Sequence, residues 1–235
     1  MHVKEGILVS ERVSSGNVEF DKLIEGGFPR GSLILLAGSP GAGKTVFSAN
    51  FIHKGVVDHG EPGVYVCLGE SRERFLRDMK RFGMDFEPLI RKGKVAVLDF
   101  SLVTDVDIQS ALNQVLETII AMGARRLVID SLTGILAGVK SELEKRHILR
   151  LLYRLVQKTG CTTIVIVDMP WGSSKIGSGV EEFIADGIIL MESEYREGVL
   201  ERRIKVLKMR GSSHTLRVYK YKIDEEKGIT DLTPA

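Results

Sequence analysis

The sequence predicts an α/β fold built on a mostly parallel β-sheet, with helices on both faces of the sheet. As far as Asp168, short apolar runs of strand length alternate with longer segments of helical character. This alternation is typical of βαβ units, whose parallel strands are buried on both faces. After Asp168 the helical segments stop, and three strand-like runs follow one another. This change predicts that antiparallel hairpins extend the sheet at one edge.

The expected elements follow in a regular order along the chain. A first strand at 32–38 is followed by a helix at 44–58. Three further strand–helix pairs and a strand are expected next, at 63–69 with 71–83, 94–100 with 104–122, 125–131 with 141–159, and 162–169. Ser141, with Glu144 three residues later, has the capping-box pattern that begins a helix. The last strands are expected at 186–193, 201–210 and 215–223, with turns at 194–198 and 211–213.

The composition is that of an ordinary globular protein. The chain has 235 residues, of which 43% are hydrophobic and 27% charged, so we expect a single domain over residues 1–235. The net charge of +2 restricts any nucleic-acid binding to a local patch. Asn and Gln are scarce while Lys, Arg and Glu are plentiful, which favours a thermophilic source.

The apolar runs also indicate where in the cell the protein is expected. None approaches the length of about 20 apolar residues that a membrane span needs, and the first residues do not have the pattern of a secretory signal. Cys67 and Cys161 lie inside apolar runs, which is typical of buried thiols in a reducing compartment. We therefore expect a cytoplasmic protein that does not cross a membrane.

The stretch GSPGAGKT at residues 38–45 matches the phosphate-loop pattern G-x-x-x-x-G-K-[ST] in full. It lies between an expected strand and an expected helix, where glycine backbone N–H groups and the positive end of the helix dipole face a phosphate. Lys44 is expected to bridge the outer phosphates of ATP, and Thr45 to offer its hydroxyl to Mg²⁺. The alternative is a chance glycine-rich turn. The residues expected to contact the nucleotide are Ser39, Pro40, Gly41, Ala42, Gly43, Lys44, Thr45 and Val46.

Two acids follow other expected strands. Asp130 ends the apolar run RRLVID, and an acid there costs desolvation unless it holds a positive group such as a hydrated Mg²⁺. The alternative is that Asp130 caps the following turn. Glu70 follows the strand at 63–69, where it could orient and deprotonate the attacking water. Glu70 could equally begin the next helix, since an acid there favours the helix dipole.

These motifs, together with the run GVEEFIADGIILME…RRIKVLKMRGSSHTLRVYKYKI, resemble the KaiC-like and RadA-like ATPases of the RecA superfamily. The resemblance is closest to a single KaiC-type domain and extends from about Gly16 to Ile223. KMRGSSH, at 208–214, is the most specific local match, because the common phosphate loop does not predict it. The resemblance implies a three-layer RecA-like fold and a hexameric ring that binds ATP or ADP with Mg²⁺ between neighbouring subunits.

The resemblance also implies roles for later residues. Lys208 and Arg210 would reach the γ-phosphate of the nucleotide bound by the adjacent subunit, and so act in catalysis with Glu70 and Lys44. Two residues apart on a strand, Lys208 and Arg210 point to the same face, which agrees with such a role. The alternative is a charged hairpin edge that blocks aggregation. Other residues implied in nucleotide contact are Met209, Ser212 and His214 from the neighbour, Asp224 near the ribose or base, and Arg81 under the base of the same subunit.

The sequence departs from the family pattern at Gly69. KaiC-type domains commonly carry two adjacent acids where this chain has Gly69 and Glu70, and the difference bears on the hydrolysis rate. We expect a Mg²⁺-dependent ATPase, with a nucleotide-gated scaffold of negligible turnover as one alternative. A RadA-like DNA-remodelling ATPase is another, and Trp171 and Lys175 in the loop at 169–183 could then contact DNA. A buried Trp171 or a loop at the subunit interface is favoured over nucleic-acid binding. Asp168 either senses the γ-phosphate or caps its turn, and the sequence identifies no protein partner.

Overall fold

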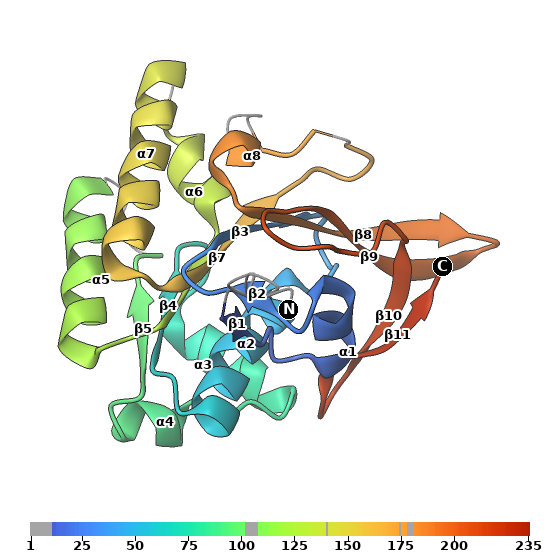
Figure 1. Ribbon diagram of the computed structural model, residues 1–235, viewed down its shortest axis with the longest axis horizontal. Coiled ribbons are helices and arrows are strands. Elements are labelled where there is room, and N and C mark those ends of the chain that lie inside the picture. Colours follow the sequence, from blue (N-terminus) through green and yellow to red (C-terminus); the bar gives the residue numbers. More distant parts are fainter. Residues whose placement is uncertain (1–10, 102–107, 140, 174, 178–180) are drawn as a thin grey trace, which may run out of the picture.

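A sheet of nine strands in the order β11-β10-β9-β8-β3-β7-β6-β4-β5 runs through the described part of the computed structural model (Figure 1). The structure describes residues 11–101, 108–139, 141–173, 175–177 and 181–235. The strands from β8 to β5 in this order are parallel to one another, whereas β9, β10 and β11 are antiparallel to their neighbours. The predicted α/β fold, with a mostly parallel sheet and antiparallel C-terminal strands, is confirmed.

The elements have the following bounds. The strands of the sheet are β3 (Leu33–Gly38), β4 (Gly63–Cys67), β5 (Val95–Asp99), β6 (Arg126–Asp130), β7 (Thr162–Asp168), β8 (Gly187–Arg196), β9 (Val199–Met209), β10 (Tyr219–Asp224) and β11 (Gly228–Pro234). A separate small sheet pairs β1 (Arg12–Val13) with β2 (Phe28–Pro29). The helices are α1 (Val18–Asp21), η1 (Lys22–Ile24), α2 (Lys44–His59), α3 (Arg72–Arg81), α4 (Glu87–Arg91), α5 (Ile108–Met122), α6 (Leu132–Ala137), α7 (Glu142–Thr159) and α8 (Glu181–Ile184).

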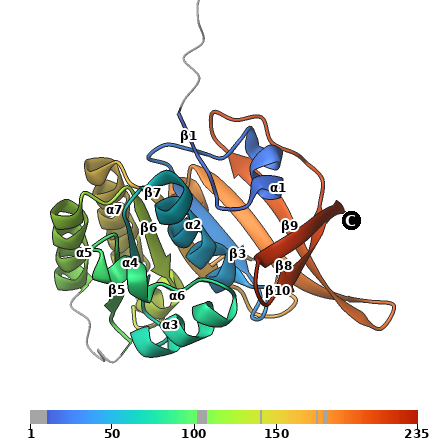
Figure 2. The same ribbon diagram turned by 90° about the horizontal axis from the view of Figure 1, so that it is seen from below.

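The core lies in two layers, one on each face of the sheet. Along β3, Ile34 and Leu36 join a cluster with α1, α2 and α3, while Leu33 and Leu35 join a second cluster with α5, α6 and α7. Alternate residues of a strand point to opposite faces, so a strand covered on both sides reads as a continuous apolar run. Figures 1 and 2 show α5 and α7 on one side of the sheet and α2 on the other. The result is a three-layer arrangement of helices, sheet and helices.

The start of helix α7 and the burial of the two cysteines agree with the sequence predictions. Ser141 precedes α7, and its hydroxyl accepts a hydrogen bond from the Glu144 N–H at 3.4 Å, as the capping-box pattern predicts. Cys67 and Cys161 are buried free thiols. The helix expected to begin at residue 104 is described from Ile108, because 102–107 lie outside the described residues. No helix among the described residues has the length and apolar character needed to cross a bilayer.

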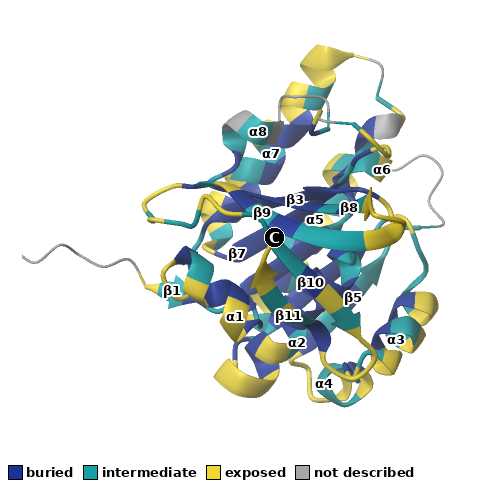
Figure 3. Cartoon of the chain, turned by 90° about the vertical axis from the view of Figure 1, so that its right-hand side faces the viewer, coloured by how far each residue is buried: buried dark blue, intermediate teal, exposed yellow. Residues whose placement is uncertain are grey.

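The C-terminal strands differ in detail from the prediction. The turn expected at 194–198 is shorter in the structure: β8 runs to Arg196, β9 begins at Val199, and Glu197 and Gly198 form the turn with positive φ. Residues 215–218, expected within a strand, instead belong to a loop that begins after Met209. A further strand, β11, pairs with β10 at the sheet edge. In Figure 3 this edge carries intermediate and exposed residues, while β3 and β7 are buried.

Candidate functional site

The phosphate loop connects the carboxyl end of β3 to the amino end of α2. Crowding by backbone requires glycine at Gly38, whereas a positive φ favours glycine at Gly43. A Cβ at Gly38 would lie 1.9 Å from the Met191 carbonyl oxygen on β8, and one at Gly43 would lie 2.6 Å from Ile223 Cδ1 on β10. Gly43 also has φ of 86°, which favours glycine. The loop is therefore shaped by the C-terminal strands as well as by its own sequence.

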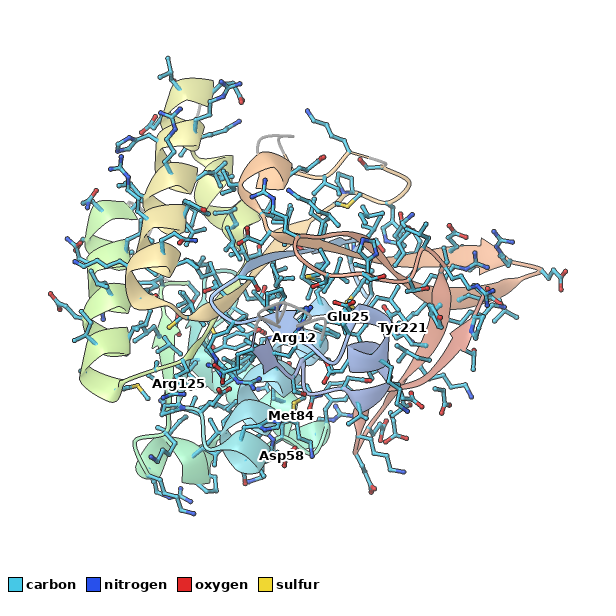
Figure 4. The ribbon with its side chains drawn as sticks, in the orientation of Figure 1. Arg12, Glu25, Asp58, Met84, Arg125 and Tyr221 are labelled. Carbon is cyan, nitrogen blue, oxygen red and sulfur yellow. The ribbon has the colours of Figure 1, made fainter. Side chains whose placement is uncertain are left out.

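Polar contacts from the same strands hold the loop from outside. Arg202 Nε on β9 donates to the Gly41 carbonyl at 3.1 Å, and the Tyr221 hydroxyl on β10 donates to the Ala42 carbonyl. Tyr221 is labelled in Figure 4. On β8, the Ser193 N–H donates to Ser39 Oγ at 3.2 Å. These bonds are accepted by two carbonyls and a hydroxyl of the loop, so they do not engage the backbone N–H groups that would bind an anion.

The Lys44 side chain lies folded into the loop and is 7% exposed. Its ammonium donates to the carbonyls of Gly38 and Ser39, both at 2.9 Å, and lies 3.1 Å from Asp168 Oδ1. The other carboxylate oxygen of Asp168 accepts from the Ser131 hydroxyl at 2.7 Å. The ammonium is therefore centred in the loop, with a carboxylate beside it that an incoming phosphate would compete with.

Asp130 ends β6 directly opposite the start of α2. Its Oδ2 accepts hydrogen bonds from Thr45 Oγ1 and from the Tyr65 hydroxyl, both at 2.8 Å. Burial raises the pKa of Asp130, and the two hydrogen bonds and Lys44 oppose this by favouring the ionised form. An ionised carboxylate beside a threonine hydroxyl is the donor pair expected at a Mg²⁺ site.

The number of protein side chains available as metal ligands also fits Mg²⁺. The described residues contain no group of three or more metal-ligating side chains that would hold an ion by themselves. Mg²⁺ is usually held by one or two carboxylates together with substrate phosphates and water. Thr45 and Asp130 would therefore hold the ion jointly with a nucleotide and not as a separate metal site.

Two adjoining cavities meet at this point. One of about 560 Å³ lies over the phosphate loop, and its lining includes Phe82, Arg202, Ile223 and Glu225. The other, of about 540 Å³, extends to Gly69, Glu70 and Arg74. Both are lined by Pro40, Thr45, Asp130 and Asp168. One continuous cleft therefore joins the phosphate loop to the predicted general base.

Glu70 is half-buried just before α3, with Arg74 Nε 3.6 Å from its carboxylate. Burial raises the pKa of Glu70, and the nearby Asp130 carboxylate raises it further, while Arg74 lowers it. Ser71, not Glu70, is the N-cap of α3. A partly desolvated carboxylate with a raised pKa, facing a cleft, is suited to accept a proton.

Lys208 and Arg210 lie far from the phosphate loop of their own chain. In the sheet, Met209 on β9 pairs with Gly187 on β8, and Gly187 pairs with Ile34 near the amino end of β3. The phosphate loop, in contrast, follows Gly38 at the carboxyl end of β3. These two positions on β3 are four residues, or about 13 Å, apart along the strand. Lys208 Nζ donates to the Ala185 carbonyl at 2.6 Å and the Glu182 carbonyl at 3.2 Å, and Arg210 pairs with Asp186 at 3.4 Å. The two cations therefore lie near the amino end of β3, at the opposite end of the strand from the phosphate loop.

The remaining residues of the KMRGSSH motif form a loop anchored to the N-terminal segment. Ser212 Oγ accepts a hydrogen bond from Arg12, and His214 Nδ1 lies 3.0 Å from the Thr215 carbonyl. Met209 is buried in the core. Ser212 and His214 are partly exposed.

Arg81 and Asp224 lie at the edge of the cleft without lining it. Arg81 is exposed at the end of α3, and the next residue, Phe82, lines the cleft instead. Asp224 Oδ1 accepts the N–H groups of Glu226 at 2.9 Å and Lys227 at 3.0 Å, and these bonds lower the pKa of Asp224. The side chain of Val46 is buried in the core, so the backbone of Val46 lies nearer to the loop than its side chain does.

The interpretation of Trp171 as a buried side chain is wrong. Trp171 is 51% exposed and stacks on Tyr195 of β8, with ring centroids 6.5 Å apart. Lys175 is also exposed.

Several residues that line or support the cleft carried no sequence signal: Tyr65, Phe82, Arg202, Ile223 and Glu225.

Comparison with known proteins gives a consistent result. A family model described as the KaiC ATPase matches residues 13–233. A UPF0273 protein of Methanocaldococcus jannaschii is 35% identical over 230 residues, which cover 92% of this chain and 94% of the relative. The circadian clock oscillator protein KaiC of Synechococcus elongatus is 31% identical over 215 residues, and the match spans 41% of KaiC. The crystal structure of a KaiC-like protein from Pyrococcus horikoshii has a TM-score of 0.87 at 38% identity, and the match covers 96% of this chain and 100% of that chain.

Proposed function

Because this chain belongs to the KaiC family of ATPase domains, we propose that it is a Mg²⁺-dependent ATPase that works between subunits of a ring. ATP is bound by the phosphate loop of one subunit, and the adjacent subunit of a hexamer completes the site. Hydrolysis is slow, since Gly69 stands where family members commonly carry a second acid. The products are ADP and phosphate.

One observation carries this proposal: the cleft that joins Lys44 and Thr45 to Asp130 and Glu70. The residues come from three separate parts of the chain, and together they supply three different chemical functions. A phosphate-binding cation, a metal-side pair and a carboxylate of raised pKa are the components that hydrolysis of a phosphoanhydride needs.

Each residue has a distinct role in the proposed reaction. Lys44 binds the outer phosphates, and Thr45 and Asp130 hold Mg²⁺, which when bound neutralises the charge of the β- and γ-phosphates. Glu70 orients a water molecule and accepts its proton as the water oxygen attacks the γ-phosphorus. The bond from the γ-phosphorus to the bridging oxygen breaks, and ADP leaves with that oxygen.

The positions of Lys208 and Arg210 support action on a neighbouring subunit. Both lie at the end of the strands opposite their own phosphate loop, and their present partners are two carbonyls and the Asp186 carboxylate. Cations that reach the neighbour's γ-phosphate stabilise the charge that develops in the transition state. A subunit alone would then bind nucleotide but lack this stabilisation.

A mixing experiment tests the action between subunits. Arg210→Ala subunits keep an intact phosphate loop, and Lys44→Ala subunits keep an intact Arg210. We expect each variant alone to be nearly inactive and co-assembled mixtures to regain part of the ATPase rate. Mixtures of Arg210→Ala with an Arg210→Ala, Lys44→Ala double variant are the matched control, because they contain no intact Arg210. Co-assembled rings that remain as inactive as this control would refute the proposal.

Gly69 favours a second candidate, a nucleotide-gated scaffold with negligible turnover. Apart from its two chain neighbours, none of the described residues has an atom within 4 Å of the place where a Cβ would lie at Gly69, so the described part of the fold leaves room for an acid there. If the protein is a scaffold, its turnover will equal that of a Glu70→Gln variant, while nucleotide still changes its assembly. Turnover clearly above the Glu70→Gln background excludes the scaffold.

A further inference from the structure

The phenol of Tyr65 is buried behind Asp130. Tyr65 lies in the middle of β4 and is fully buried. Its hydroxyl donates to Asp130 Oδ2 at 2.8 Å, and Ser48 Oγ on α2 lies 3.1 Å from the same hydroxyl. A phenylalanine would fill the same volume, so packing by itself does not account for the hydroxyl.

The two hydroxyl groups of the described residues that donate to the Asp130 carboxylate bind the same oxygen. Thr45 Oγ1 and the Tyr65 hydroxyl each lie 2.8 Å from Oδ2, and Oδ1 accepts no hydrogen bond from the described residues. Two donors from different elements, α2 and β4, fix the rotation of a carboxylate about its Cβ–Cγ bond. Such a carboxylate keeps its second oxygen available for a cation or its water shell.

The Tyr65 ring is itself held in place. It stacks on Phe75 of α3 with centroids 4.2 Å apart and an interplanar angle of 29°. Ser48 Oγ lies 3.1 Å from both the Tyr65 hydroxyl and the Thr45 carbonyl and can donate its one hydrogen to either, so Ser48 places the Tyr65 hydroxyl beside the first turn of α2. The donor therefore stays in position when Thr45 turns its own hydroxyl oxygen to a metal ion.

We propose that Tyr65 is a positioning residue for the Mg²⁺ site, which orients the Asp130 carboxylate through its buried hydroxyl. The inference rests on the proposed function, because it assigns Mg²⁺ to Thr45 and Asp130. Tyr65 touches neither nucleotide nor metal. Its contribution is to metal affinity, and nucleotide binding without metal does not depend on it.

Binding of a fluorescent ADP analogue, titrated with MgCl₂ or measured in excess EDTA, tests this role. Loss of a hydrogen bond to a metal-site carboxylate typically weakens metal affinity by about 10- to 100-fold. We expect Tyr65→Phe to need at least about tenfold more Mg²⁺ for the half-maximal increase in nucleotide affinity. Its affinity in EDTA should equal that of the wild type, which separates a positioning role from general damage to the fold.

Tyr153→Phe is the matched control, because Tyr153 lies on α7 in the core layer on the other face of the sheet. It should leave the Mg²⁺ dependence unchanged. Ser48→Ala serves as a second variant if Tyr65→Phe does not fold, and it should shift the Mg²⁺ requirement in the same direction. An unchanged Mg²⁺ requirement in the folded variant overturns the role of Tyr65 while leaving the proposed function intact. A wild-type protein whose nucleotide affinity ignores Mg²⁺ overturns both.

Discussion

At the scale of single residues, Glu70 makes the most direct prediction about pH. Burial and Asp130 raise the pKa of Glu70 above its ordinary value of 4.5. A general base works in its ionised form, so the hydrolysis rate should rise with pH through this raised pKa. The acidic limb of the kcat/KM profile should therefore lie above 4.5. Glu70→Gln should lower kcat by about 10²- to 10⁴-fold and remove this limb.

Arg74 provides a check on the sign of the Glu70 effect. Its charge lowers the pKa of Glu70, so Arg74→Ala should move the acidic limb to higher pH. Arg77→Ala makes the same change of charge on the same helix, and Arg77 pairs with Asp78 instead of Glu70. The Arg77 variant should leave the limb near its wild-type position. A limb that moves equally in both variants, or to lower pH in Arg74→Ala, would contradict the assignment of Glu70.

The sequence predicted those site residues that belong to a fixed local pattern. Lys44 and Thr45 follow from the loop motif, and Asp130 follows from an acid at the end of an apolar strand. Tyr65 could not be predicted, because an aromatic residue within a buried strand is ordinary and its hydroxyl meets Asp130 from 65 residues away. Phe82 was missed for a related reason. The sequence drew attention to the charge of Arg81, whereas the fold turns the neighbouring ring to the cleft.

At the scale of elements, strand β1 is linked to the KMRGSSH loop. Arg12 donates to Ser212 Oγ and, at 3.4 Å, to the Gly211 carbonyl, and pairs with Glu25 at 2.7 Å. Figure 4 labels both Arg12 and Glu25. The Thr215 N–H donates to the Leu23 carbonyl at 3.0 Å, which adds a second link to the N-terminal region. The loop that follows Lys208 and Arg210 is therefore fixed by residues from the other end of the chain.

Arg12→Ala should loosen this loop without disturbing the phosphate loop. We expect faster amide hydrogen exchange at residues 211–215 and a lower ATPase rate in assembled protein, with nucleotide affinity of the isolated subunit unchanged. Arg217→Ala, which removes an exposed arginine from the same loop, is the control. Unchanged exchange in Arg12→Ala would show that the Leu23 contact is sufficient to hold the loop.

Element prediction from sequence succeeded where periodicity was strong and failed where tertiary contacts decide. The buried strands and the long helices α2 and α7 follow from apolar runs and caps. The pairs β1–β2 and β10–β11 depend on contacts between distant segments, and short or half-exposed strands carry little pattern. The turn at Glu197 and Gly198 was predicted too long, at 194–198, because charged residues such as Glu194 and Arg196 are typical of a loop. In the structure both lie within β8, where Glu194 pairs with Arg196 on the same strand and with Arg203 on β9.

At the scale of the whole molecule, the phosphate loop and the Lys208–Arg210 pair lie at opposite ends of the central strands, the loop beyond the carboxyl end of β3 and the two cations near its amino end. If the two cations complete the site of a neighbouring chain, as proposed, the contact joins two different surfaces of identical chains, and such head-to-tail association closes into a ring when the rotation permits. A two-fold dimer would instead pair one patch with itself. The arrangement therefore favours a cyclic assembly over an isolated pair.

The terminal phosphate should control this assembly. With ATP and Mg²⁺, preferably in a Glu70→Gln background that preserves the ATP, Lys208 and Arg210 gain a charged partner on the neighbour that ADP does not supply. Sedimentation velocity should therefore show a larger assembly with ATP than with ADP, and the difference should shrink as salt concentration rises. In a Lys208→Ala, Arg210→Ala variant, ATP and ADP should give the same size distribution. Lys222→Ala, Arg217→Ala is the control of equal charge, since both residues are exposed on the surface. An assembly of the same size with either nucleotide in the Glu70→Gln background would mean that the γ-phosphate does not connect the subunits.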